Sequence, residues 1–149
     1  MHPFDLKQML MEKHAQHVVL IHFPIALFVA GVALDFAAQW TKRQALGFAA
    51  YTNLLLAAVM ALPAVATGLV AWQWALAGHR VRGVLLLHMV FGLTSTALIV
   101  VVWLIHFRAR RGAATVLPNY RLPLEFVGVA LLAITGHLGG FLSGVNGPG

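Results

Sequence analysis

The run VVLIHFPIALFVAGVALDFAAQ, from Val18 to Gln39, decides the fold class of this chain. It reaches the roughly 20 residues that an α-helix needs to cross about 30 Å of hydrocarbon. In lipid such a run must be helical, because each backbone donor and acceptor has to be satisfied within its own segment. The run therefore predicts a transmembrane helix.

Three further apolar runs of similar length follow it, at Ala50 to Leu76, Val84 to Phe107 and Leu122 to Leu142. The chain has 149 residues, of which 60% are hydrophobic and 9% charged, and its mean hydropathy is +0.85. A soluble domain cannot bury so much apolar surface. We expect an all-α integral membrane protein, a single domain over residues 1–149 built as an up-down-up-down bundle of four transmembrane helices.

Composition also excludes several kinds of site. The chain has no cysteine, so disulfides, thiolate metal sites, cysteine-held iron-sulfur clusters and covalently attached c-type haem are excluded. The net charge is +6, but no basic run with interleaved aromatic residues lies outside the apolar runs. We therefore expect contact with membrane lipid and no nucleic-acid partner.

Cations are distributed unevenly between the two sides of the predicted bundle. Four helices place both termini on one side of the membrane. That side has fewer cations (Lys7, Lys13, Arg80 and Arg82) than the other (Lys42, Arg43, Arg108, Arg110, Arg111 and Arg121). Because cytoplasmic loops carry an excess of lysine and arginine, we expect both termini to lie outside the cytoplasm.

Three histidines from three predicted helices lie at one depth. His22 and His88 each follow the start of a run by about four residues, and His137 precedes the end of the last run by about five. At 1.5 Å per residue, all three lie about 6 to 8 Å below the surface on the terminal side. A single membrane histidine is more simply explained by a structural role, but three at one depth predict a cofactor or metal site.

Glycines stand close to two of these histidines. Gly92 follows His88 by one helical turn, and His137 is flanked by Gly136, Gly139 and Gly140. Small residues let a flat macrocycle lie against a helix backbone, as in bundles that hold a cofactor in the core. Small residues also mediate ordinary helix packing in membranes, which is the alternative interpretation.

The remaining polar groups have simpler interpretations. We expect His14, His17 and His79 to be solvated groups at the interface, and His106 to extend to the surface beside Arg108. Two acids lie toward the opposite side, Asp35 and Glu125. Ion pairs explain these two acids better than a proton relay or a quinone contact, and the candidate partners are Lys42, Arg43, Arg108 and Arg121.

The ligand types narrow the choice of cofactor. Histidines without a nearby carboxylate or thiolate suit haem b with two axial imidazoles, or a mononuclear zinc, copper or iron site. A hydrolytic zinc site needs a general base close by, and both acids lie at the far side. No nucleophile and base pair, phosphate loop or dinucleotide fingerprint is present. We therefore expect no catalysis by protein side chains alone.

Short motifs along nearly the whole chain resemble a known family. They are HFPIALF at residues 22–28 with Asp35 beyond it, ATGL at 66–69, the early histidine His88 and TGHLGG at 135–140. The chain is similar to the bacterial membrane family called domain of unknown function 2231. That family is a four-helix membrane domain, often fused to Rieske iron-sulfur or c-type cytochrome domains, and its histidine-bearing positions match His22, His88 and His137. The resemblance implies electron transfer at the exported face of the bacterial inner membrane.

Together, the residues and the resemblance predict a small membrane cytochrome b with one haem near the periplasmic face. It would be an electron-transfer subunit rather than a stand-alone enzyme, and would pass electrons between the quinone pool and a periplasmic partner, a c-type cytochrome or Rieske protein. Whether it is a subunit of a larger complex stays open. His22 and His88 are the expected axial ligands, and His137 either replaces one of them or orients a ligand. Two alternatives stay open: a histidine-held copper or iron site for metal handling, and a cofactor-free accessory or assembly subunit whose histidines hydrogen-bond across helices.

Overall fold

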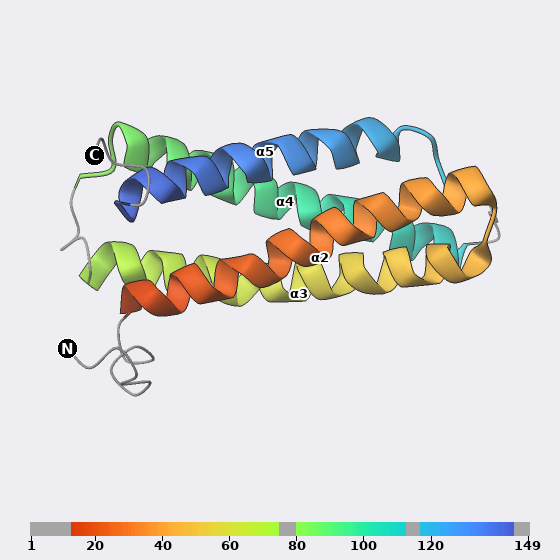
Figure 1. Cartoon of the computed structure of the whole chain (residues 1–149), viewed down its shortest axis with the longest axis horizontal. Helices are drawn as coiled ribbons and strands as arrows, with labels where there is room; N and C mark the ends of the chain where they lie inside the picture. Colours follow the sequence, from red (N-terminus) through yellow and green to blue (C-terminus); the bar gives the residue numbers. More distant parts are fainter. Residues whose placement is uncertain (1–12, 75–79, 113–116, 145–149) are drawn as a thin grey trace.

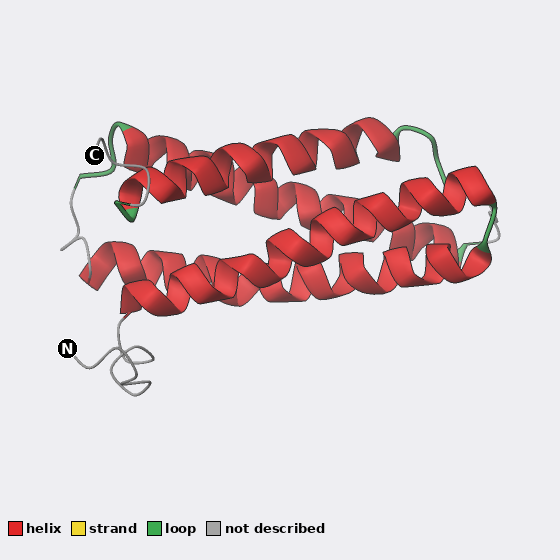
Figure 2. Cartoon of the chain, in the orientation of Figure 1, coloured by secondary structure: helices red, strands yellow, loops and turns green. Residues whose placement is uncertain are grey.

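The computed structural model describes residues 13–74, 80–112 and 117–144, with side chains from residue 16 onward. This part of the chain consists of helices joined by loops (Figure 1, Figure 2). The helices are α2 (Lys13–Thr41), α3 (Gln44–Trp74), α4 (Val84–Arg111) and α5 (Arg121–Leu142). All four are long and apolar enough to cross a membrane. The predicted all-α bundle of four transmembrane helices is confirmed.

The helices pack as two antiparallel pairs. The closest packing is between α2 and α3 and between α4 and α5, while α3 with α4 and α2 with α5 join one pair to the other. Helices α2 and α4 therefore stand diagonally across the bundle. The start of α2, the end of α3, the start of α4 and the end of α5 all lie at the same end of the molecule (Figure 1). We call this end the proximal end and the opposite one the distal end.

Three of the helices extend several residues beyond the apolar runs that predict them. Helix α2 begins at Lys13 rather than near Val18, and α3 begins at Gln44 rather than near Ala50. Helix α4 continues to Arg111, with three arginines in its last turn that interact favourably with the helix dipole. Hydropathy marks the part of a helix that lies in hydrocarbon, whereas backbone hydrogen bonding continues into the interface. As a result, His17 belongs to a transmembrane helix.

A tight turn joins α2 to α3 at the distal end. Its backbone passes through the left-handed region at Lys42 (φ 58°), and the amide of Lys42 donates to the Ala38 carbonyl at 2.8 Å. This geometry closes the end of α2 and reverses the chain within two residues, because α3 begins at Gln44. The turn therefore fixes α2 and α3 as close antiparallel neighbours.

The middle of the bundle is a small apolar core. It consists of Phe28, Val32, Leu54, Ala57, Ala58, Ile99, Val102 and Leu132. Two glycines make close packing possible there: a Cβ added at Gly31 would lie 2.9 Å from Leu54 side-chain carbons, and one at Gly128 would lie 2.8 Å from the Phe28 ring. The outer surface carries large exposed apolar side chains, including Phe23, Leu62 and Phe126, as expected of a surface in contact with lipid. Apolar side chains thus make up both the core and much of the outer surface.

Candidate functional site

A pocket opens between the two helix pairs at the proximal end. Its volume is about 390 Å³, and all four helices contribute to its lining. The lining is mostly apolar, and its titratable members are His17, His22 and His88. The pocket therefore lies at the end of the bundle where the sequence predicts a cofactor site.

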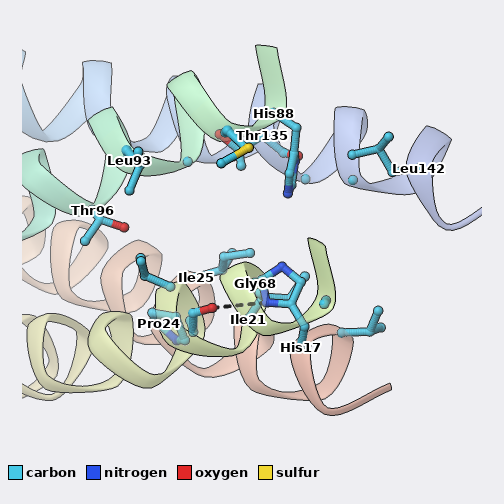
Figure 3. Close-up of a pocket in the computed structure, with 18 of the residues that line it drawn as sticks. His17, Ile21, Pro24, Ile25, Gly68, His88, Leu93, Thr96, Thr135 and Leu142 are labelled. Atoms are coloured by element: carbon cyan, nitrogen blue, oxygen red, sulfur yellow. Dashed lines mark hydrogen bonds between the residues drawn. The ribbon is translucent and has the colours of Figure 1, made fainter. Parts of the chain in front are cut away.

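Two imidazoles face each other across this pocket. His17 of α2 and His88 of α4 point toward one another from opposite helix pairs (Figure 3). Their ring centroids are 6.4 Å apart, and the ring planes are nearly perpendicular, at 85°. Both side chains are half-buried. Each follows the first residue of its helix by four positions, so the two rings reach the same depth from the same end.

A backbone carbonyl of the adjacent helix holds each ring. Nδ1 of His17 lies 3.1 Å from the Ala64 carbonyl and 3.3 Å from Oγ1 of Thr67, both on α3. Nδ1 of His88 lies 3.1 Å from the Thr135 carbonyl on α5. Because a carbonyl oxygen only accepts, each Nδ1 carries the hydrogen, and in a neutral imidazole the lone pair is then on Nε2. Such bonds are typical of metal-binding histidines, since they fix the tautomer and the ring orientation.

Two glycines give the rings their space. A Cβ added at Gly68 would lie 2.9 Å from Cε1 of His17, and one at Gly139 would lie 3.2 Å from Cε1 of His88. Around Gly136 an added Cβ would meet nothing within 4 Å. The four glycines singled out in the sequence all line the pocket: Gly92, Gly136, Gly139 and Gly140. Gly68, in the ATGL motif, is an additional one.

The structure does not bring His22 and His137 to the centre of the pocket. His22 is exposed at its edge, and its Nδ1 lies 2.6 Å from the Val18 carbonyl of its own helix. His137 is exposed and packs against the Phe141 ring at 4.9 Å. Of the three histidines at one predicted depth, only His88 faces the opposite helix pair.

Helical geometry explains this difference. His22 follows His17 by five residues, which turns it about 140° around α2, and His137 lies about 200° around α5 from Gly139. His17 itself, which we expected to be solvated, lies in the pocket because α2 starts earlier than its apolar run. The HAQH segment directly before that run is the sequence signal that points to it. His2, His79 and the side chain of His14 lie outside the described residues.

A second group of polar side chains is buried at the distal end. We call Asp35, His106, Arg121 and Glu125 the distal cluster; each of these residues is at most 3% exposed. Nε of Arg121 donates to Oδ2 of Asp35 at 2.8 Å, which confirms one of the predicted ion pairs. The expectation that His106 extends to the surface is wrong, because its Nε2 lies 3.0 Å from Oε1 of Glu125.

Comparison with known proteins identifies the chain at the level of a family. The family described as "Predicted membrane protein (DUF2231)" matches residues 13–147, a region that includes the four helices, the pocket and the distal cluster. No curated protein and no solved structure gives a significant match.

Proposed function

The chain belongs to DUF2231, a family of predicted membrane proteins, and we propose that it is a small membrane cytochrome b whose His17 and His88 hold one haem. In this proposal it carries electrons between the quinone pool and a periplasmic redox protein. His17 takes the place of His22 in the expected ligand pair, because His17 is the α2 histidine that faces His88. The observation that carries the proposal is this opposed pair of imidazoles.

The separation of the two rings suits a single metal ion between them. Imidazole binds metals through one nitrogen at about 2.0–2.1 Å, so two rings on opposite sides of one ion have centroids about 6 Å apart. The His17 and His88 centroids are 6.4 Å apart. The angle between the ring planes does not affect this agreement, because each ring can turn about its own metal–nitrogen axis.

The donor set favours haem over a bare ion. None of the described residues that line the pocket is acidic, and the chain has no cysteine. Structural zinc takes four protein ligands. Haem brings four nitrogens of its own, so that two histidines complete its coordination. The apolar lining and a volume within the range of about 300–1,000 Å³ for ligand pockets also suit an apolar macrocycle.

The chain's own residues would orient and accommodate the group, while haem would supply the one-electron redox chemistry. The carbonyls of Ala64 and Thr135 hold the two imidazoles, and Gly68 and Gly139 leave room for them. His17 lies about 6 Å along the axis from the start of α2. A group held there lies close to the proximal surface, within reach of a docked redox protein. The distribution of cations makes this surface periplasmic in the proposed topology.

The same contacts also favour a second candidate, a cofactor-free accessory subunit. Each histidine already bonds a neighbouring helix through Nδ1, and polar bonds between helices stabilise membrane bundles without any cofactor. A copper or iron ion held by the two imidazoles alone is the third possibility. These candidates differ in their optical spectra and in their metal content.

Visible spectra of the detergent-purified protein, oxidised and reduced with dithionite, test the proposal. Protein produced with ample haem is expected to show a Soret band and a sharp α band on reduction. Copper or iron without a Soret band would support the bare-ion candidate. If the protein shows no Soret band and contains no copper or iron, the accessory subunit is the function that remains.

Histidine variants then test the ligand pair. We expect His17→Ala and His88→Ala each to abolish haem binding, and His137→Ala to retain it. The His22→Ala variant distinguishes the two ligand pairs. If it retains haem, His17 and His88 are the supported pair. If it loses haem while His17→Ala retains it, the ligands are His22 and His88.

A further inference from the structure

The distal cluster lies far from the pocket. Asp35 follows His17 by 18 positions on α2, which corresponds to about 27 Å along the helix. Three helices supply the cluster: Asp35 comes from α2, His106 from α4, and Arg121 and Glu125 from α5. The proposed electron carrier uses none of these residues, so their burial needs a separate explanation.

Burial makes the net charge of the cluster important. Arg121 brings one positive charge, and Asp35 and Glu125 would bring one negative charge each when ionised. With a neutral His106 the cluster would then hold one unbalanced negative charge, although each of its four residues is at most 3% exposed. An uncompensated charge in an apolar interior is strongly unfavourable and is usually removed by a change of protonation.

Other charged groups do not supply the missing compensation. Arg110, on the same helix as His106, is directed toward α3, where it donates to the Gly47 carbonyl and lies 4.5 Å from the Tyr51 ring centroid. Arg111 lies over the Phe107 ring. Gln39 of α2 contacts Arg121 but is neutral. In the contacts resolved for the described residues, Arg121 is the cation of the cluster.

We propose that the distal cluster binds one proton, shared between His106 and Glu125. Asp35 is the less suitable carrier, because it already accepts from Nε of Arg121 at 2.8 Å. Oε1 of Glu125 is 4.0 Å from that nitrogen and 3.0 Å from Nε2 of His106. With one proton on this pair, as imidazolium beside carboxylate or as imidazole beside carboxylic acid, the cluster is neutral as a whole.

A second oxygen of the same carboxyl group supports this assignment. Oε2 of Glu125 is buried and has no hydrogen-bond partner within the described part of the chain. A fully ionised carboxylate with one unsatisfied oxygen in an apolar interior is costly, whereas protonation or a neighbouring imidazolium reduces that cost. The unsatisfied oxygen therefore belongs to one of the two residues that share the proposed proton.

A divalent metal ion fits the cluster less well. Asp35, His106 and Glu125 can each offer one ligand atom, all within 4.8 Å of one another, and such donors do bind metals. A divalent ion would give the cluster a net positive charge next to the Arg121 guanidinium. A proton leaves the cluster neutral, and for this reason we assign it a proton.

Spectroscopy of the wild-type protein in lipid nanodiscs tests the proposal directly. Infrared spectra report a protonated carboxyl group by its carbonyl band, and ¹⁵N NMR of histidine-labelled protein reports imidazolium. At neutral pH we expect one of these two signals in the wild-type protein. In Glu125→Gln the cluster is neutral without the proton, so loss of the signal in this variant assigns it to the cluster. If Glu125→Gln does not fold, His106→Gln provides the second assignment: the His106 imidazolium signal is lost in it, and the proton of the cluster is then expected as a carboxylic acid band.

Each result decides the question. A Glu125 carboxylic acid or a His106 imidazolium supports the proposal. Neutral His106 together with ionised Glu125 in the wild-type protein overturns it. Stoichiometric zinc, found by elemental analysis after addition of zinc alone and lost in His106→Gln, also overturns it in favour of a metal site. None of these results depends on whether the pocket holds haem.

Discussion

Arg121 of α5 contacts Asp35 of α2 through a hydrogen bond of 2.8 Å between Nε and Oδ2, although 86 positions separate the two residues. Nη2 of the same guanidinium donates to Oε1 of Gln39, also at 2.8 Å. Helices α2 and α5 belong to different pairs, so one arginine joins the two pairs at the distal end. The pocket lies between the same two pairs at the proximal end.

Removing this arginine is expected to destabilise the bundle strongly. Arg121→Gln leaves Asp35 buried without its cation, and the loss of one partner from a buried ion pair costs about 3–5 kcal/mol. The free energy of unfolding in detergent measures the effect. Arg108→Gln, an exposed change on α4, is the control and should stay within about 0.5 kcal/mol of the wild type. Similar losses in both variants would contradict the assigned role of Arg121.

A methyl group at Gly68 is expected to disturb the pocket. In Gly68→Ala the new Cβ would lie 2.9 Å from Cε1 of His17, so the imidazole has to move away from its position opposite His88. We expect at least a tenfold weaker binding of haem, measured by titration of the apoprotein. Gly47→Ala is the matched control, since its Cβ meets only Ala38, at 3.9 Å. Equal affinities would show that His17 does not need its observed position.

The contact between Phe28 and Gly128 is expected to be sensitive to added volume. A Cβ at position 128 would lie 2.8 Å from the Phe28 ring, and overpacking of a core typically costs about 1–3 kcal/mol. Gly128→Ala should therefore lower the free energy of unfolding in detergent. Gly136→Ala, on the same helix with open space around the new Cβ, should have no such cost. If both changes lower stability alike, close packing is not the reason.

Acidification is expected to release the proposed haem. Imidazole binds a metal only in its neutral form, so protons compete with the metal for His17 and His88. Occupancy should be full at neutral pH and fall as the pH decreases. The Soret band followed during acid titration and back-titration measures this loss. A haem band unchanged at a pH where the bundle remains folded but free imidazole is fully protonated would contradict histidine ligation.

The orientation of the chain in the membrane can be measured by labelling single introduced cysteines, because the chain has no cysteine of its own that would react. Ser143→Cys lies beyond α5 at the proximal end, and Gln44→Cys starts α3 at the distal end. Both positions are exposed. In intact cells a membrane-impermeant maleimide is expected to label position 143 and to leave position 44 unlabelled until the cells are opened. The reverse pattern would place the pocket on the cytoplasmic side.

The end of the bundle at which a side chain lies could be predicted from the sequence, whereas its exact depth on α2 and its direction around the helix could not. Counting residues from the ends of the apolar runs placed Asp35 and Arg121 on the same side, and they form an ion pair there. The same count grouped His22 with His88, although His22 is turned about 140° away from His17, which faces the pocket. Direction depends on which faces the helices pack together, and apolar runs with little amphipathic character carry almost no information about it.

The end of a helix was the second point at which the sequence was insufficient. His106 stands next to an arginine-rich segment, which favours an exposed position. It is buried because Glu125, from another helix, bonds to its ring. Such pairs depend on tertiary contacts, so composition near a helix end did not reveal this one.

The carbonyl bonds of the two histidines have a mechanical consequence. His17 is held by its partner helix α3, and His88 by its partner helix α5, so each ring moves with its own helical hairpin. The distance between the rings therefore measures how far the two hairpins are spread at the proximal end. A group bound to both would act as a removable cross-link between the hairpins. Its loss would let that end of the bundle open while the arginine at the other end keeps the hairpins joined.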